Sequence, residues 1–283
     1  MIAIQLLNGL ALGVLLLVLA SGLAMIYGLR GVINFSHGAL YTLGAYVGLT
    51  VSQVGFWPAL VVAPLALAGL GALLDLGGLR FISHRGQLPL LLVTYGLALV
   101  LNDAVLGIWG PEDRSLPPPS GLDGSVRLFG EPYPAYRLFL VMVGLVVGGL
   151  LLLWLRSSRT GLYVRAAARD RELTAVMGVN VDRTSTLVVA LGAGLAGLAG
   201  VLAGPYLSLS PSMGTQILVD SFVVVVVGGL GSIGGAMIAA LLLGMLQVIG
   251  TVLVPELAAL APYALMVAVL LWRPAGLLGR SQQ

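Results

Sequence analysis

The chain has 283 residues, of which 59% are hydrophobic and only 9% are charged, and its formal net charge is +3. Soluble globular domains carry about 25% charged residues, so this composition excludes a soluble fold and is typical of a protein embedded in lipid. The chain has no cysteine, which excludes disulfides and zinc–thiolate sites. All 14 basic residues are arginines, and the absence of lysine excludes a Walker A phosphate loop and Schiff-base chemistry.

Apolar runs recur along the chain, and about 20 apolar residues suffice to cross a membrane as a helix. The first run covers residues 6–27 with no basic residue before it, so we expect a membrane span rather than a cleaved signal peptide. The other runs cover residues 39–54, 58–79, 88–109, 138–155, 186–207, 217–227, 236–254 and 258–272. They predict an all-α fold, a polytopic membrane helical bundle of eight or nine transmembrane segments that forms one domain over residues 1–283.

Two irregular stretches stand next to two short runs. RGVINFSHG, at residues 30–38, precedes the run 39–54, and GGLGSIGG, at residues 228–235, follows the run 217–227. Irregular backbone inside a membrane is tolerated only where protein or a water-filled cavity surrounds it, and interrupted helices in both halves of a chain indicate a translocation pathway. The candidate pathway residues are Asn34, Ser36, His37, Gly38, Gly228, Gly229, Gly231 and Ser232.

The same residues also have structural explanations. Asn34 or Ser36 can cap a helix that begins there, and His37 can be a buried histidine whose ring bonds within the protein. The glycines of both breaks can serve close helix contact, and this alternative stays open beside the pathway. Another set of small residues spaced four apart predicts helix packing alone: Gly192, Ala196, Gly200 and Gly204.

Three acids lie within or near the predicted spans, where an ionisable group suggests function by default. Asp75, however, lies close to Arg80 and to the end of its span. Asp103 lies near the other end of a different span, and Asp220 begins a short helix whose N-terminus it can stabilise. None of the three acids by itself predicts a site.

The arginines predict the orientation because short cytoplasmic connections collect basic residues. Eleven of the 14 lie in the connections around residues 30, 80–85, 156–183 and 273–280. The connection 110–137 holds three arginines and four acids and is expected to be the outer loop. With nine crossings, the N-terminus would be outside and the C-terminus in the cytoplasm.

The connection at residues 157–184 is basic and too long for a simple turn. Its alanine-rich part, residues 162–177, favours a helix, and Gly178 supplies a helix stop. The apolar residues near one face of that helix are Leu162, Ala166, Leu173 and Met177. We expect a short cytoplasmic helix that docks a partner, and the alternative is an amphipathic helix that rests on acidic lipid headgroups.

No catalytic residue and no metal site is expected. The stretch GLGSIG lacks the nucleophile elbow, because Leu230 stands two residues before Ser232 where glycine is required. Two histidines and no H-E-x-x-H motif leave no metal cluster. An ion-coupled secondary transporter is the alternative from another class, but it would place acids in mid-span and has no need of a long basic connection.

Four stretches together resemble the LivH-type permeases of branched-chain amino acid ABC importers. They are MIYGLRGVINFSHGALYTLGAYVG, GLYVRAAARDRELTAVMGVNVDR, GGLGSIGGAMIAALLLG and WRPAGLLG, and they extend over nearly the whole chain. The resemblance implies a transmembrane permease domain in the bacterial inner membrane. The implied partners are a second related permease, two ABC ATPase subunits and a periplasmic or lipoprotein solute-binding protein, besides membrane lipid. No nucleic-acid partner is expected, and the chain itself would hold no cofactor because the partner subunits would bind ATP.

The resemblance also implies that residues 157–184 form the coupling loop that inserts into the ATPase. The coupling residues would be Arg165, Ala166, Arg169, Asp170, Ala175 and Gly178. The chain departs from the family pattern where Ala39 follows the first break in place of an acid, and where Gly234 replaces a common proline. Urea and short-chain amide permeases share the scaffold, so they are the alternative substrate classes.

Overall fold

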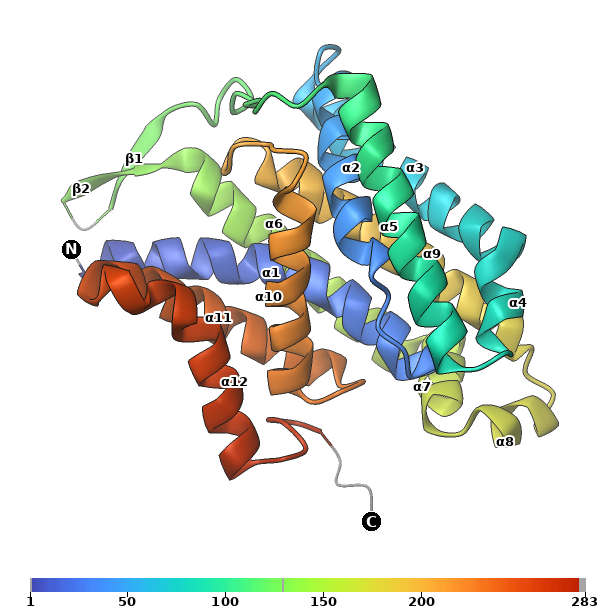
Figure 1. Cartoon of the computed structure of the whole chain (residues 1–283). Coiled ribbons are helices and arrows are strands. Elements are labelled where there is room, and N and C mark those ends of the chain that lie inside the picture. Colours follow the sequence, from blue (N-terminus) through green and yellow to red (C-terminus); the bar gives the residue numbers. More distant parts are fainter. Residues whose placement is uncertain (1, 129, 280–283) are drawn as a thin grey trace.

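The computed structural model describes residues 2–128 and 130–279 and is built mainly of helices (Figure 1). The helical elements are α1 (Ile2–Arg30), α2 (Ser36–Val51), α3 (Phe56–Leu74), the π-helical turn η1 (Asp75–Leu79), α4 (Arg80–Ser83), α5 (Gln87–Trp109), α6 (Ala135–Ser157), α7 (Arg159–Arg169), α8 (Arg171–Val176), α9 (Val181–Ala203), α10 (Met213–Gly228), α11 (Ile233–Leu253), the 3-10 helix η2 (Pro255–Leu260) and α12 (Ala261–Trp272). The strands β1 (Ser125–Leu128) and β2 (Glu131–Pro134) form an antiparallel hairpin. Arg280, one of the arginines behind the predicted orientation, lies outside the described residues.

Seven helical segments within the described residues are long and apolar enough to cross a membrane. Two of them are compound, since α3 continues through η1 into α4, and η2 continues into α12. Helices α2 and α10 have 16 residues each and are the two short ones. The predicted polytopic helical bundle with two short helices is therefore confirmed.

Helix α1 is the central element of the bundle because it is apolar on every side. Of the 18 consecutive residues that are most apolar in α1, 89% are buried. The corresponding share is 17% in α5 and 22% in α6. It crosses the middle of the molecule and packs against α11, α9, α6 and α10 (Figure 1). The exposed apolar helices around it provide the surface that can face lipid or partner chains.

Glycines allow α1 and α11 to approach closely with antiparallel axes. A Cβ atom at Gly9 would lie 2.7 Å from Met245 Cα, and one at Gly13 would lie 2.9 Å from Leu241 Cα. Such distances are too short for a real Cβ atom, so both positions need glycine. The residue numbers of the contacts increase along α1 while they decrease along α11, so the two helices run antiparallel.

The stripe of small residues on α9 serves helix packing, as predicted. A Cβ atom at Gly192 would lie 2.6 Å from Ile26 Cδ1 of α1, and one at Gly200 would lie 2.6 Å from the backbone nitrogen of Ala45 in α2. Helix α9 also packs along the length of α3. It is therefore the element that joins α1, α2 and α3 into one body.

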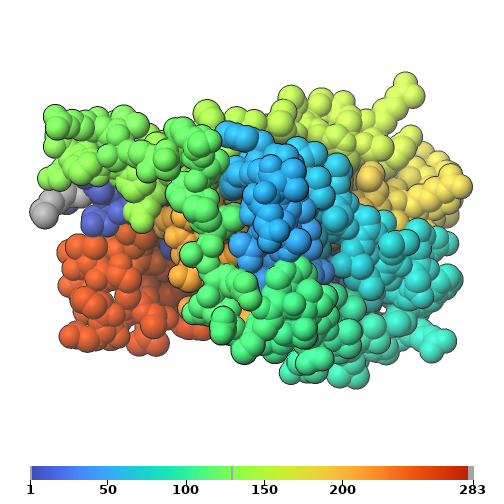
Figure 2. Space-filling model, turned by 90° about the horizontal axis from the view of Figure 1, so that it is seen from above, coloured from blue at the N-terminus to red at the C-terminus, as the bar shows by residue number. Residues whose placement is uncertain are grey.

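The two long connections lie at opposite ends of α1. Near the start of α1, Asn8 Oδ1 accepts a 2.6 Å hydrogen bond from Arg137 Nη1, which follows the β-hairpin. At its other end, Arg30 donates to Ser185 Oγ at 3.0 Å, in the part of α9 that follows α7 and α8. Seen from above, the connection with the hairpin (green) spreads between the end of α2 (blue) and the N-terminal end of the chain (Figure 2).

Candidate functional site

Helix α7 turns back tightly from the end of α6. Ser158 caps α7, because its hydroxyl oxygen accepts a 2.9 Å hydrogen bond from Gly161 N. A Cβ atom at Gly161 would lie 2.5 Å from the carbonyl oxygens of Trp154 and Leu155, so only glycine fits there. These residues hold α7 directly against α6.

The single helix predicted over residues 162–177 is wrong in one respect, because the segment contains two helices. Helix α7 ends at Arg169 and α8 begins at Arg171. Asp170 between them is extended, with φ −153° and ψ 106°, and its carboxylate caps α8 by accepting a 2.8 Å hydrogen bond from Leu173 N. Aspartate competes with the helix backbone in this way, and the neighbouring alanines do not.

The predicted helix stop at Gly178 is confirmed. Gly178 has φ +84°, in the left-handed region that favours glycine. Its N–H donates to the carbonyl of Ala175 at 3.0 Å, and the N–H of Val179 donates to the carbonyl of Thr174 at 3.3 Å. This pair of bonds is a Schellman motif, which satisfies the last carbonyls of α8 and directs the chain toward α9.

A groove of about 950 Å³ opens between α7, α8 and the start of α9. The apolar residues predicted to share a helix face all line it: Leu162, Ala166, Leu173 and Met177. Leu173 is 60% exposed and Met177 is 77% exposed, so the described part of the chain does not cover this apolar surface. An uncovered apolar groove of this kind is typical of a docking site for a protein.

The structure brings most of the predicted coupling residues together at the groove. Ala166, Arg169, Asp170 and Gly178 line it. Arg165 and Ala175 are exposed on the same two helices but do not line the groove. Their role in coupling stays a prediction.

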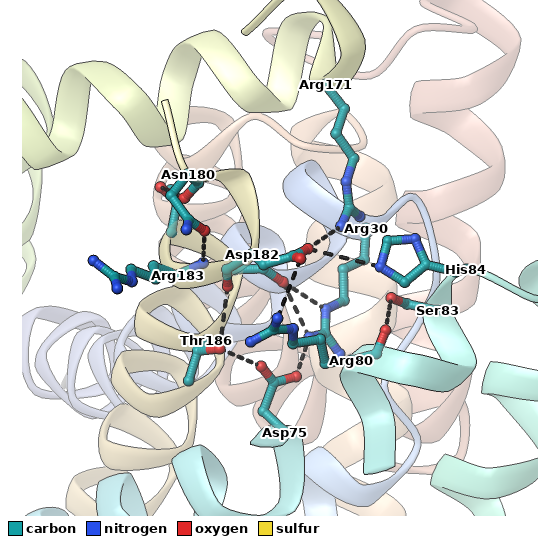
Figure 3. A network of polar contacts seen from close by, with 12 residues as sticks. Arg30, Asp75, Arg80, Ser83, His84, Arg171, Asn180, Asp182, Arg183 and Thr186 are labelled. Carbon is teal, nitrogen blue, oxygen red and sulfur yellow. Dashed lines mark hydrogen bonds and ion pairs between the residues drawn. The ribbon is translucent and has the colours of Figure 1, made fainter. Parts of the chain in front are cut away.

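A buried ion pair lies beside the α7–α8 unit, which we define as residues 159–176. The guanidinium of Arg30, at the end of α1, pairs with the carboxylate of Asp75 in η1, and the two side chains are 4% and 0% exposed. Ser185 Oγ accepts from Arg30 at 3.0 Å, and Thr186 Oγ1 donates to Asp75 Oδ2 at 2.7 Å. Both buried charges are thus paired and hydrogen-bonded (Figure 3), as burial of ions requires.

A second, more exposed cluster surrounds Asp182 in the first turn of α9. Its carboxylate lies 3.1 Å from Arg171 Nη2, 3.5 Å from Arg80 Nη2 and 3.7 Å from His84 Nε2 (Figure 3). Arg171 comes from α8, Arg80 from α4, and His84 directly follows α4. One carboxylate therefore connects three separate parts of the chain.

Sequence reasoning missed this network. It singled out Asp75 and placed it near Arg80, but Asp75 pairs with Arg30, and Arg80 pairs with Asp182. The sequence did indicate that Asp75 needs a cationic partner, because an unpaired acid within an apolar segment is energetically costly. The partner itself was hidden because 45 residues separate Arg30 from Asp75.

The first predicted break lies against the middle of α1. Asn34 Oδ1 accepts hydrogen bonds from the backbone nitrogen of Ser36 at 3.1 Å and from its hydroxyl at 2.6 Å, so Asn34 caps the start of α2. His37 is buried, and its Nε2 donates to the carbonyl of Leu19 at 3.0 Å. Gly38 packs against the start of α10 at Gly214.

The second predicted break lies at the other end of α10 and does not meet the first. A Cβ atom at Gly231 would lie 3.2 Å from Gly28 Cα near the end of α1, and Gly229 packs against the C-terminal tail. Ser232 caps α11 by accepting a 3.1 Å hydrogen bond from Gly235 N. Both breaks thus have packing and capping roles, and their part in a translocation pathway stays a prediction.

A third irregular stretch, residues 204–212, precedes α10. The predicted span 186–207 extends into this stretch, although α9 ends at Ala203. Within this stretch, Leu209 exchanges two backbone hydrogen bonds of 2.8 Å with Arg114. The prolines at positions 205 and 211 were the available signal for this interruption.

Comparison with known proteins relates the whole chain to one family of transport proteins. The family model described as "Branched-chain amino acid transport system / permease component" matches residues 5–270. The chain is 30% identical to the high-affinity branched-chain amino acid transport system permease protein LivH of Salmonella typhimurium, over 98% of this chain and 96% of that protein. It is also 30% identical to BraD of Pseudomonas aeruginosa, with the same two shares.

The chain is also 31% identical to LivM of Escherichia coli, over 93% of this chain and 67% of LivM, which is likewise named a permease protein. Among solved structures, a chain of PsaBC from Streptococcus pneumoniae in complex with Fab shows a TM-score of 0.47 and 15% identity, over 94% of this chain and 89% of that one. The family match covers far more than half of the chain, and within residues 2–128 and 130–279 seven helical segments are long and apolar enough to span a membrane. This multi-pass membrane protein therefore belongs to the permease component family of branched-chain amino acid transport systems.

Proposed function

We propose that this chain is a permease subunit of an ABC importer and that it translocates branched-chain amino acids delivered by an extracytoplasmic binding protein. The observation that carries the proposal is the similarity to LivH and BraD over 98% of the chain, which includes both breaks and the α7–α8 unit. The names of these relatives favour branched-chain amino acids over urea or short-chain amides as the transported class.

Energy would come from separate subunits. The chain has no lysine for a Walker A loop, so we propose that two ABC ATPase subunits bind ATP and that this chain holds no cofactor. The ATPase would dock at the groove of the α7–α8 unit through Ala166, Arg169, Asp170 and Gly178, with Arg165 and Ala175 beside it. The exposed apolar and basic residues of this unit suit insertion into a partner surface that is apolar and acidic.

This chain would act together with a second permease subunit. The chain resembles both LivH and LivM, two relatives that are each named permease proteins, and this supports a second, related permease as its partner. The apolar surface of α5 is available for such contacts, since only 17% of its 18 most apolar consecutive residues are buried. We place the pathway at Asn34, Ser36, His37 and Gly38, and at the second break around Gly228, Gly229, Gly231 and Ser232.

The orientation follows from charge and from the position of the connections. We propose a bacterial inner-membrane protein with its N-terminus outside and its C-terminus in the cytoplasm, because the arginine-rich connections around residues 30, 80–85 and 156–183 meet at the start of α9. The start of α6, which follows the β-hairpin, and the start of α9, which follows the α7–α8 unit, bond to opposite ends of α1, which supports placing the two connections on opposite sides.

The test uses the complex of this chain with its ATPase and second permease, reconstituted in liposomes with the binding protein. Uptake of labelled leucine should require ATP. Gly178→Val should weaken ATPase docking, because a β-branched residue is strained at φ +84°. Gly149→Ala is the matched control, because a Cβ atom there meets nothing within 4 Å. Leucine transport by the chain alone, driven by an ion gradient, would refute the proposal.

A further inference from the structure

We infer that Asp182 is the positioning residue that ties the α7–α8 unit to the membrane helices and passes its movement on to them. The inference rests on the proposed function, since it concerns how a movement of the α7–α8 unit, caused by the docked ATPase, is transmitted to the membrane helices. It depends on four features of the structure: the weak attachment of α8, the cations around Asp182, the buried pair behind it and the ability of Asp182 to change partners.

Helix α8 is held loosely by packing. Leu173, Val176 and Met177 are 60%, 82% and 77% exposed, and Thr174 is its one buried residue. The backbone and hydroxyl hydrogen bonds of α8 stay within residues 170–179. In the described part of the chain, its one ion pair to another element joins Arg171 to Asp182. A lightly packed helix takes its position from such a contact.

Asp182 connects α8 to α4 and α9 at the same time. Its Oδ1 accepts a 3.1 Å hydrogen bond from Arg171 Nη2 and lies 3.7 Å from His84 Nε2, while its Oδ2 lies 3.5 Å from Arg80 Nη2. Arg80 begins α4, which continues α3 through η1. A displacement of α8 therefore acts on the start of α9 and on the end of the α3–α4 segment through one carboxylate (Figure 3).

The buried pair makes the structure behind Asp182 rigid. Arg30 and Asp75 join α1 to η1, and Ser185 and Thr186 join both to α9. Thr186 Oγ1 is also 3.1 Å from the backbone carbonyl of Asp182, so the two clusters touch. Removing one partner of such a pair leaves a buried unpaired charge, so α1, η1 and α9 are expected to move together.

Asp182 can release α8 without becoming unpaired. The side chains of Arg80 and Arg171 are 33% and 32% exposed, and ion pairs at this exposure are weak and exchangeable. When Arg171 leaves, Arg80 and His84 still face the carboxylate. The contact is thus suited to a helix that changes position in each transport cycle, whereas the buried Arg30–Asp75 pair is not.

The experiment compares five variants in the reconstituted complex: Asp182→Asn, Arg171→Gln, the double variant, Asp182→Glu, and Arg85→Gln as the control. Arg85 is exposed, two residues beyond α4, and makes no ion pair within the described residues. Two quantities are measured, namely hydrogen exchange of residues 171–176 and leucine uptake per ATP hydrolysed. Asp182→Glu, which keeps the charge, tests for rescue.

We expect Asp182→Asn and Arg171→Gln each to speed exchange in α8 and to lower uptake per ATP by about fivefold or more, the range of typical coupling between sites. The double variant should be no worse than Asp182→Asn alone, because Asp182→Asn already removes the contact with Arg171. Arg85→Gln should match the wild type, and Asp182→Glu should recover most of the loss. The inference would be overturned if the loss of uptake per ATP in the double variant equalled the product of the two single losses. It would also be overturned if the single variants left hydrogen exchange in α8 unchanged.

The two proposals fail in different ways. If the wild-type complex takes up no leucine but Asp182→Asn still speeds exchange in α8 and Arg85→Gln does not, the link stands and the proposed function fails. If uptake is normal and the variants leave both exchange and uptake per ATP unchanged, the function stands and the link fails.

Discussion

Arg30 and Asp75 show how a charged pair is held inside an apolar protein. Each ion has a second partner, since Arg30 also donates to Ser185 and Asp75 also accepts from Thr186. A pair of this kind adds little net stability compared with apolar packing, but it is costly to break from one side. Its main effect is to specify which parts of the chain meet.

Asp75→Asn should destabilise the protein strongly. The variant leaves the guanidinium of Arg30 buried and uncompensated, a change that costs about 3–5 kcal/mol in buried pairs. We expect a clear fall in the midpoint of thermal unfolding of the purified chain in detergent. Asp103→Asn is the control, because Asp103 is exposed and makes no ion pair in the described residues. Equal midpoints for the two variants would contradict the expected cost of leaving Arg30 buried without its partner.

At the scale of elements, a single residue decides whether the α7–α8 unit is one helix or two. The segment is rich in alanine and arginine, which favour helix on both sides of Asp170. Asp170 instead uses its carboxylate to cap α8, and this turns the chain between the helices. The turn gives the unit two walls, and the groove lies between them and α9.

Asp170→Ala should weaken α8, because loss of an N-cap costs about 1 kcal/mol. We expect faster hydrogen exchange in residues 171–176 and weaker binding of the ATPase. Asp170→Asn keeps an oxygen that can accept from Leu173 N, so it should retain most of the protection. If Asp170→Ala exchanged no faster than Asp170→Asn, capping would not be what holds α8.

The orientation of the whole molecule can be tested because the chain contains no cysteine. Single cysteines at Asp123 and Glu172 occupy exposed positions, one before the β-hairpin and one in α8. A membrane-impermeant maleimide applied to intact cells should label position 123, and it should label position 172 only after permeabilisation. The reverse pattern would mean that the arginine-rich connections face outward.

What the sequence determined was the class of the molecule and the position of its spans. Hydrophobic length is a local property, so the spans could be predicted from residues close together in the chain. The cap at Asn34, the helix stop at Gly178 and the packing stripe of α9 are local or periodic as well, and the structure agrees with them. The predicted bundle needed no knowledge of contacts.

Only the tertiary structure decided which charges meet and where the breaks lie. Arg30 reaches Ser185 across 155 positions in the chain, and Asp182 gathers cations from α4 and α8. A lone sequence does not encode such distant partners in any local pattern. The two breaks were paired because each stands beside a short apolar run in its half of the chain, yet they lie at opposite ends of α10, because helix packing rather than local composition sets their positions.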